Sequence, residues 1–457
     1  MHKLLPASLL LAAATPFGAL ADTPSDIAAL RQEIQAMRAA YEARLQALEA
    51  RLQAAEAAAS APAVAAASVA PPAPAAPAGP APVAAPASPT AAAAAGGGNA
   101  FNPAISLILS GLYTRTSKDP ATYTISGFQL PPDAEVGPGT RGFSLAESEL
   151  GFAASIDPWW RGVAAIALHP DDSVSVEEAY VQTTALGNGL SVKLGRFFSG
   201  IGYLNPQHAH IWDFVDSPLA YQAMLGSQFG DDGVQVQWLA PTAQYVELGV
   251  ELGRGRSFPG SDSSRNGAGM AALTAHTGGD IGDSHSWRAG LSYLRTRAKD
   301  RAFMLPGAAD GAFTGSTRVA IADFVWKWAP NGNIRETNFK LQGEYFVGRE
   351  RGDVTYFYGF NPDPAYPYSP RQSGWYLQGV YQFMPAWRVG ARYDRLDAGE
   401  IDSFKAQRAS AMIDWSSSEF SRLRLQFTRA KTVADVTDNQ WFAQYIVSMG
   451  AHGAHKY

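Results

Sequence analysis

The chain has 457 residues, a formal net charge of −5 and no cysteine. Without cysteine it forms no disulfide, uses no thiolate nucleophile and binds no zinc through sulfur. The slight acidic excess argues against a nucleic-acid partner, because neutralising phosphates requires clustered Lys and Arg. With 11 Trp, 18 Tyr and 44 Gly, the composition is rich in aromatic residues and glycine.

The N-terminal residues are typical of an export signal. Residues 1–21 read MHKLLPASLLLAAATPFGALA, with a basic start, an apolar stretch and the small-x-small ending Ala19-Leu20-Ala21. This pattern predicts a secretory signal peptide cleaved before Asp22. No later run of about 18 apolar residues predicts a membrane-spanning helix. The mature chain is therefore expected in the periplasm, outside the cell, or in the outer membrane as a β-barrel.

Residues 22–56 are predicted to form a periplasmic coiled-coil helix. Ser25 can cap a helix, and apolar residues from Ile27 to Leu52 recur at gaps of 3, 4, 3, 4, 4, 3 and 4, which is a heptad pattern with one stutter. Ile and Leu at both core positions favour trimers or higher oligomers over dimers. The alternative is a single amphipathic helix that packs on its own barrel. Residues 57–99 are so dense in Ala and Pro that they predict a semi-extended linker.

Residues 100–457 change to a period of two, which is typical of β-strands. In the segment 339–347, for example, Phe, Leu, Gly, Tyr and Val alternate with Lys, Gln, Glu and Phe. One apolar and one polar face per strand fits a half-buried sheet and equally a membrane barrel with a wet interior. We place 16 strands at about 104–117, 143–156, 160–168, 174–186, 190–198, 232–240, 244–253, 268–277, 285–297, 317–329, 336–349, 372–384, 387–398, 403–415, 421–431 and 440–451.

The connections between these strands favour the membrane barrel. Links after even-numbered strands are mostly short, such as Asp157-Pro158 and Pro385-Ala386, whereas those after odd-numbered strands are more often long, the longest being Ser199 to Asp231. Short turns at one rim and long loops at the other are typical of outer-membrane barrels. Tryptophans near the short turns form the expected interfacial girdle: Trp159, Trp160, Trp238, Trp287, Trp326, Trp328, Trp387 and Trp415. The sequence therefore predicts a 16-stranded antiparallel transmembrane β-barrel rather than a secreted β sandwich.

One part of the barrel sequence carries a family resemblance. Its residues are Glu177 to Val181 (EEAYV), the turn Leu186 to Gly189 (LGNG), Leu190 to Phe197 (LSVKLGRF), Gly202, Asn205, and Gly142 to Pro158 (GFSLAESELGFAASIDP). They resemble the phosphate-selective (O and P type) porin family over about residues 140–230. The resemblance implies a trimer of 16-stranded barrels, each with a third loop that folds into the lumen and narrows it.

The chain departs from that family's pattern at the expected constriction. Members of the family place several lysines there, whereas residues 199–231 contain no Lys or Arg. Phosphate selectivity is therefore not carried over. We interpret five residues of this segment as a pore constriction: His208, His210, Asp213, Asp216 and Asp231. A second hypothesis makes His208, His210 and Asp213 the ligands of a divalent metal ion.

Strand parity predicts which charged side chains face the interior. The basic ones are Lys193, Arg288, Lys340, Arg388, Arg392, Arg408, Arg422 and Arg424. Glu147 and Glu149 are also predicted to face inward. These charges form either a solvated wall or a basic wall opposite an acidic loop, which would create a transverse field across the lumen. A glycosidase-like role for the two glutamates is not favoured, because an i, i+2 pair on an open wall lacks a pocket.

These features predict a passive outer-membrane porin for small hydrophilic or charged solutes. It is expected to be a homotrimer in contact with outer-membrane lipid, with no cofactor and no enzymatic activity. The alternative is uptake of zinc or copper through the loop that carries His208, His210 and Asp213. An active receptor would need a plug domain and a larger barrel, and an enzyme would need a catalytic constellation. His452 and His455 near the C-terminus are interpreted as rim residues or as a loose metal contact.

Overall fold

The structure, a computed structural model, describes residues 103–132, 136–264, 266–303, 310–358 and 361–450. The chain divides into two compact units, residues 1–79 and 80–457, and all described residues belong to the second unit. The predicted signal peptide (1–21), coiled coil (22–56) and linker (57–99) lie outside the described residues, as do His452 and His455. No helix in the described ranges is long and apolar enough to cross a membrane.

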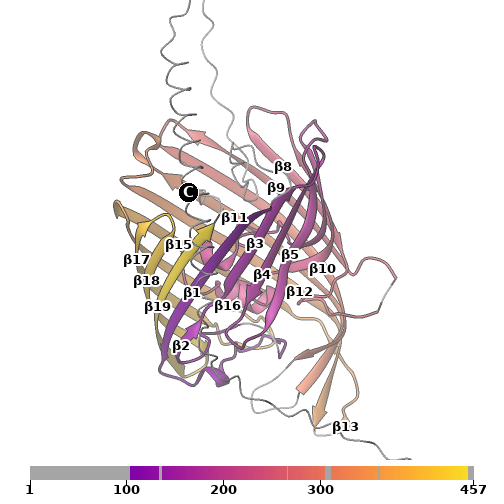
Figure 1. Ribbon diagram of the computed structural model, residues 1–457. Coiled ribbons are helices and arrows are strands. Elements are labelled where there is room, and N and C mark those ends of the chain that lie inside the picture. Colours follow the sequence, from indigo (N-terminus) through magenta and orange to yellow (C-terminus); the bar gives the residue numbers. More distant parts are fainter. Residues whose placement is uncertain (1–102, 133–135, 265, 304–309, 359–360, 451–457) are drawn as a thin grey trace, which may run out of the picture. The chain divides into compact units, whose positions relative to one another are not determined.

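Sixteen antiparallel strands in the described residues close into a barrel (Figure 1). Successive strands pair with each other, and β1 closes the ring against β19, which leaves no unpaired sheet edge. The strands are β1 (Ala104–Thr116), β2 (Gly142–Leu145) with β3 (Ser148–Ser155), β4 (Trp160–Leu168), β5 (Val174–Thr183), β6 (Leu190–Phe198), β7 (Gly230–Leu239), β8 (Tyr245–Gly253), β9 (Met270–Ile281), β10 (His285–Phe303), β11 (Asp310–Trp328), β12 (Asn338–Tyr358), β15 (Arg371–Met384), β16 (Trp387–Asp397), β17 (Gln407–Ser418), β18 (Ser421–Val433) and β19 (Val436–Gly450). The predicted fold class is confirmed.

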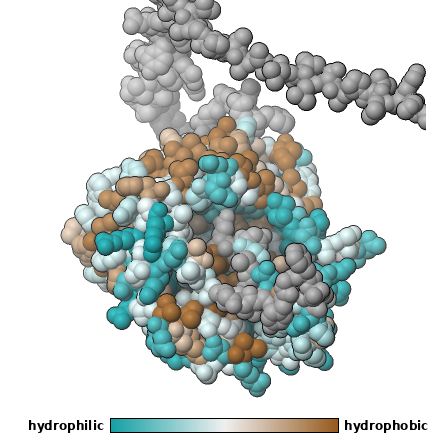
Figure 2. Space-filling view, turned by 90° about the horizontal axis from the view of Figure 1, so that it is seen from below, coloured by the Kyte–Doolittle hydropathy of each residue, from teal (hydrophilic) through white to brown (hydrophobic). Residues whose placement is uncertain are grey.

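Short elements lie in the connections at both rims. The segments β13 (Asn361–Pro362) and β14 (Tyr366–Tyr368) pair with the end of β12. The one-turn helix η1 (Pro120–Thr122) follows β1, and η3 (Pro330–Gly332) lies in the connection between β11 and β12. Figure 2 looks at the end that carries β13 and shows mainly hydrophilic residues there, with hydrophobic residues gathered along one side.

The outer face of the barrel is apolar along the predicted alternation. Leu291, Tyr345 and Leu425 are 67%, 49% and 51% exposed, whereas their strand neighbours of opposite parity are buried. Trp387 and Trp415 pair across β16 and β17 beside the short turn at 385–386, with ring centroids 6.2 Å apart. Large exposed apolar side chains on every second position are what a lipid-facing wall requires.

Two strand irregularities alter which glutamates face inward. Gly111 pairs with Leu145, but Ile108 pairs with Glu149, so the second strand has one residue more than β1 between these pairs. The extra residue reverses parity and turns Glu149 to the inner face, although Leu145 faces outward. Glu149 therefore faces the interior as predicted, whereas Glu147 lies in the break between β2 and β3, where strand parity does not apply, and its inward orientation stays a prediction.

A second irregularity lies between β4 and β5. Ala165 pairs with Glu178 and Ile166 pairs with Val176, which leaves Glu177 as an extra residue. Such a bulge allows two consecutive side chains to project to the same side of a sheet. The glutamates at 177 and 178 both reach the interior as a result.

The long connection between β6 and β7, residues 199–229, lies inside the barrel. It contains η2 (Ala209–Ile211) and α2 (Leu219–Leu225). Its residues contact inner-face side chains of β3, β8, β12, β16, β17 and β18. Only a segment within the ring can reach strands that are distributed around its circumference. We call this segment the lumen loop.

The lumen loop is held partly by a hydrophobic core. Apolar residues of the loop, including Leu204 and Tyr221, pack with the loops at 117–141 and 398–406 and with the inner wall. The wall contributes Leu294, Ile321 and Phe346, which are at most 2% exposed. The interior is therefore not lined only by polar residues, as strict alternation predicts, because the loop brings its own apolar surface to the wall.

Candidate functional site

Asp213 joins the lumen loop to β12 and β16. Its carboxylate oxygens lie 2.5 Å from Lys340 Nζ and 3.3 Å from Arg388 Nη1, and Gln378 Nε2 donates a hydrogen bond to it at 3.0 Å. Burial alone would raise the pKa of this carboxyl, but Lys340 and Arg388 hold the pKa of Asp213 well below its usual range. Asp213 is therefore a buried anion that fastens the loop to the wall.

Asp216 makes the equivalent contact with β16 and β17. Its two carboxylate oxygens lie 2.9 Å from Arg392 Nη2 and 2.5 Å from Arg408 Nη1. Burial opposes the charged carboxylate, but the guanidinium groups of Arg408 and Arg392 lower the pKa of Asp216. Asp394 lies against the same arginines and accepts a hydrogen bond from the backbone N–H of Leu219 at 2.8 Å, which places the first turn of α2.

Two further arginines hold the backbone of the loop. Arg424 donates to the carbonyl oxygen of Trp212 at 2.6 Å, and Arg422 donates to the carbonyl oxygen of His210. A guanidinium that donates to a main-chain oxygen fixes the path of the chain as well as its charge. The segment from 210 to 217 is thus bound along its length by β16, β17 and β18.

The predicted inner basic wall is therefore a binding surface for the loop. Arg288 lies over the ring of Tyr203, 5.4 Å from its centroid, whereas Lys193 lies over the ring of Tyr180 at 4.4 Å. Seven of the eight predicted residues contact the lumen loop: Arg288, Lys340, Arg388, Arg392, Arg408, Arg422 and Arg424. At these contacts the opposite charges of wall and loop lie within ion-pair distance and compensate each other locally, and the transverse field across the lumen stays a prediction.

The five predicted constriction residues do not form one set. Asp213 and Asp216 are paired with the wall, and their carboxylates are 4% and 9% exposed, so they do not present free charges to water. Asp231 lies on β7 and accepts hydrogen bonds from the backbone N–H groups of Gly255 and Arg256 in the next loop. Asp231 lies on the strand that follows the lumen loop, and it binds the connection between β8 and β9 instead of taking part in a constriction.

The two histidines of the loop meet glutamates instead of Asp213. His208 Nδ1 lies 2.9 Å from Glu149 Oε2 and 3.3 Å from Glu177 Oε2, and its Nε2 lies 3.1 Å from Glu178 Oε2. His210 Nδ1 lies 3.3 Å from the same Glu149 oxygen. The predicted metal-ligand set of His208, His210 and Asp213 is thus corrected in its third member, since Asp213 is bound by the basic wall.

The electrostatics differ between the two imidazoles. Burial disfavours a charged ring at both, but Glu149 and its neighbours outweigh burial at His208 and raise its pKa well above the ordinary value. At His210 burial prevails over the attraction of Glu149, and the pKa is lowered. Parity could not have identified Glu177 and Glu178 together, because consecutive residues of a regular strand face opposite sides.

Sequence reasoning also missed Glu344 on β12. Its carboxylate accepts hydrogen bonds from the backbone N–H groups of Tyr203 and Leu204, both at 3.1 Å. It also accepts from the hydroxyls of Tyr221 at 2.9 Å and Tyr376 at 2.6 Å. Gly202 permits this approach: its φ is +65°, and a Cβ there would lie 2.4 Å from Glu344 Oε2. Alternation indicates that Glu344 faces inward, but no sequence pattern indicates that it binds the first part of the lumen loop.

Comparison with solved structures relates the barrel to outer-membrane proteins. A loop L8 deletion mutant of OmpT, an outer membrane protein of Vibrio cholerae, matches with a TM-score of 0.51 and 11% identity over 77% of this chain and 100% of that chain. An anion-selective porin from Comamonas acidovorans matches with a TM-score of 0.48 and 12% identity over 76% of this chain and 99% of that one. The match to OmpT supports the fold.

Sequence comparison finds a relative of similar length. No family model matches the chain, so membership of the phosphate-selective porin family stays a prediction. An uncharacterised protein of Aquifex aeolicus is 32% identical over 391 residues, covering 78% of this chain and 80% of that protein. The chain therefore belongs to the same family as this Aquifex aeolicus protein. In this chain the fold is a closed 16-stranded antiparallel barrel.

Proposed function

We propose that the protein is an outer-membrane porin that admits small hydrophilic or charged solutes by passive diffusion. The observation that carries this proposal is a closed barrel with an apolar exterior and a loop bound inside it. Channel-forming barrels combine a lipid-facing outside with a lumen that a loop reduces in width. In this proposal the lumen loop reduces the width of the lumen, and solutes pass through the cross-section that remains.

Planar-bilayer recording tests the channel. Purified protein should produce stepwise, ohmic conductance, and a trimer should close in three equal steps. Deleting residues 207–216, which include the contacts of Asp213 and Asp216, should increase the single-channel conductance several-fold, because it removes part of the segment proposed to reduce the width of the lumen. A protein that inserts into the bilayer without conducting, both intact and with the deletion, would refute the porin function.

Selectivity should differ from that of a phosphate channel. The arginines and lysines nearest the loop are engaged by Asp213, Asp216 and main-chain oxygens, and the loop itself carries no Lys or Arg. We therefore expect no strong preference for anions. The reversal potential in a salt gradient measures this directly, and a pronounced anion preference would contradict the proposal for the loop.

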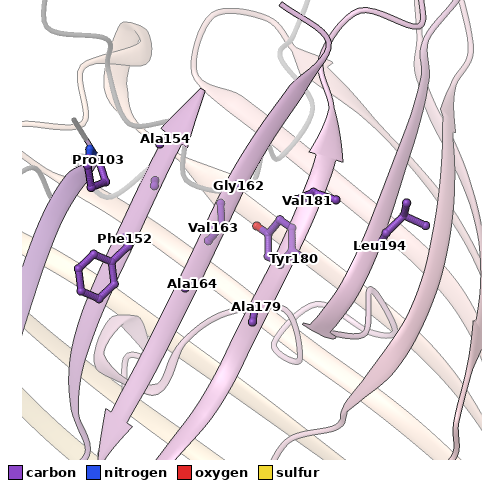
Figure 3. Close-up of a pocket in the computed structure, with 11 residues that line it drawn as sticks. Pro103, Phe152, Ala154, Gly162, Val163, Ala164, Ala179, Tyr180, Val181 and Leu194 are labelled. Carbon is purple, nitrogen blue, oxygen red and sulfur yellow. The ribbon is translucent and has the colours of Figure 1, made fainter. Parts of the chain in front are cut away.

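A homotrimer is supported by the shape of the outer wall. A shallow groove of about 420 Å³ crosses β3, β4, β5 and β6 (Figure 3), and small side chains line much of it, among them Ala154, Gly162, Ala164 and Ala179. Small residues let two walls approach closely in a membrane. We propose that a neighbouring copy of the chain occupies this groove, while the predicted coiled coil at 22–56 joins the three chains in the periplasm.

Substitution within the groove separates its contribution to the trimer from that of the predicted coiled coil. Ala164→Trp should fill the groove and reduce the trimer fraction in mild detergent, as measured by native mass spectrometry. Leu291→Trp on β10, whose side chain is 67% exposed on the outer wall away from the groove strands, is the matched control and should leave the trimer intact. Deleting residues 22–56 should weaken assembly further. A trimer that survives both changes together would refute the proposed interface.

A further inference from the structure

The lumen loop and the inner wall bring together three side chains with the donor atoms of a transition-metal site. His208, His210 and Glu149 each direct one ligand atom into a common space, and these atoms lie within 4.8 Å of one another. The Glu149 Oε2 atom lies 2.9 Å from Nδ1 of His208 and 3.3 Å from Nδ1 of His210. A tetrahedral ion with bonds of about 2.0–2.1 Å spaces its ligands about 3.3–3.4 Å apart. Two of the required separations are thus already close to those of a bound ion.

The surroundings supply the outer contacts that such an ion needs. Nε2 of His208 lies 3.1 Å from Glu178 Oε2, which orients the ring so that Nδ1 faces Glu149. Glu178 is itself fixed, because its Oε1 accepts the backbone N–H of Phe198 at 3.1 Å. A carboxylate on the far nitrogen of a ligating imidazole is a recurring feature of zinc sites. Glu177 Oε2, 3.3 Å from His208 Nδ1, is a further oxygen donor next to these three ligands.

Charge balance points in the same direction. Three carboxylates, those of Glu149, Glu177 and Glu178, converge on two imidazoles in a region where each of these side chains is about nine-tenths buried. Lys193 lies over the ring of Tyr180 and offsets part of the charge of Glu178, whereas Arg422 donates to the carbonyl oxygen of His210, so the three carboxylates still outnumber the cations that face them. Buried carboxylates require compensation by a cation or a metal ion. A divalent ion between the imidazoles would compensate them more completely than a single protonated ring.

The two strand irregularities create this arrangement. The break between β2 and β3 turns Glu149 inward, and the bulge between β4 and β5 turns both Glu177 and Glu178 towards His208. Without either irregularity, one of the ligands or its support would face the lipid. Bulges that re-aim side chains are common next to functional sites.

We propose that Glu149, His208 and His210 bind one divalent transition-metal ion, with zinc as the probe, and that the ion clamps the lumen loop to the β3–β5 wall. The donors come from both the loop and the wall, so binding joins the two. The site is enclosed between them, and its role is to hold the loop rather than to pass metal. This proposal does not depend on channel activity.

Zinc binding to the full mature chain in detergent tests the proposal. The chain is treated with chelator and carries His452→Ala and His455→Ala, which remove the histidine pair near the C-terminus. Calorimetric titration should then show one zinc ion per chain. Glu149→Gln and His210→Ala should each weaken binding about 100-fold or more, and Glu178→Gln, which alters only the supporting contact, about 10- to 100-fold.

His276→Ala is the matched control. His276 is also buried and lies 3.3 Å from a glutamate oxygen, that of Glu247, but no third metal donor joins them among the residues described. This variant should keep the affinity of the parent. Equal weakening by His276→Ala, or binding that Glu149→Gln leaves unchanged, would overturn the assignment.

A spectroscopic measurement tests the site without substituting its ligands, and so does not depend on whether the variants fold. Zinc-edge X-ray absorption of the chain with Glu149, His208 and His210 intact should show two imidazole ligands and light oxygen donors in four-fold coordination. Six-fold coordination by oxygen alone, or no retained zinc after dialysis, would refute the site regardless of how the substitutions behave.

Discussion

The two sides of the lumen loop are held by opposite chemistry. At residues 213–217 an acidic loop meets a basic wall, with Asp213 and Asp216 paired to lysine and arginine of β12, β16 and β17. At residues 208–210 the polarity reverses, and imidazoles meet three glutamates of β3 and β5. Guanidinium and ammonium groups stay charged over the whole physiological range and do not bind metal ions, whereas an imidazole nitrogen can bind either a proton or a metal ion. One side is therefore a permanent anchor, and the other is suited to regulation by a ligand.

Removing the permanent anchor should have the largest effect. The double substitution Arg392→Met with Arg408→Met leaves the buried carboxylates of Asp216 and Asp394 uncompensated, which costs about 3–5 kcal/mol for a broken buried pair. The chain has no cysteine, so Ala220→Cys on the fully buried α2 offers a clean probe of loop opening. Maleimide should label this thiol at least about 100-fold faster in the double variant, since about 1.4 kcal/mol is tenfold.

The matched control for that experiment is Arg318→Met. Arg318 is an exposed arginine of β11, and its loss should leave the labelling rate within about twofold. A labelling rate that stays unchanged in the double arginine variant would show that the hydrophobic core, rather than the ion pairs, holds this side of the loop.

The next effect in size concerns Glu344. It belongs to neither the basic wall nor the glutamate cluster, and it binds the backbone near the start of the lumen loop, at Tyr203 and Leu204. Glu344→Ala removes the acceptor of two backbone N–H groups and two tyrosine hydroxyls, at a cost of about 1–3 kcal/mol for a buried donor left unpaired. Thermal unfolding in detergent should shift accordingly. Glu344→Gln retains one carbonyl acceptor and should recover part of the loss, whereas equal shifts in both variants would indicate that the negative charge itself matters.

Acidification should break the ion pairs of Asp213 and Asp216 only at a pH well below the pKa of an ordinary carboxyl group. The pKa values of Asp213 and Asp216 are lowered by Lys340, Arg388, Arg392 and Arg408, despite burial and the neighbouring Asp394 and Asp414. A lowered folded-state pKa stabilises the folded state above the unfolded value, about 3.9, and this stabilisation is lost as the pH falls through the folded value. Single-channel conductance should therefore stay constant from pH 7 to about 4.5 and rise only well below pH 4. A rise centred above pH 5 would contradict this anchor.

The smallest effect is expected outside the lumen. Arg196 and Asp232 form an ion pair at 2.6 Å, but their side chains are 27% and 35% exposed. Such partly exposed pairs contribute about 0–1 kcal/mol. Asp232→Asn should thus leave both conductance and maleimide labelling of the Ala220→Cys probe nearly unchanged, and a large shift in either would show that the two anchors do not control the loop alone.

The sequence predicted which strand residues face the interior, but not which residues of the lumen loop they bind. Alternation identified Arg392, Arg408 and Arg424 as inward because every second residue of a regular strand faces the same side. It could not identify their partners, because Asp213 and Arg388 are 175 residues apart in the chain and the loop has no period that reports its path. The same rule could not foresee the extra residue between the pairs Gly111–Leu145 and Ile108–Glu149, which reverses the parity of everything that follows it in the strand.

By itself, the sequence determined the barrel: the approximate strand positions, the short and long connections, and the face on which each residue of a regular strand lies. These follow from local rules, namely the two-residue period and the chemistry of turns. Only the tertiary structure decided what the side chains of the lumen loop contact, because its histidines and aspartates bind groups on strands remote in sequence. Strand irregularities, which change parity by a single residue, placed Glu149 and Glu177 beside His208, and no local rule in this sequence marks where they occur.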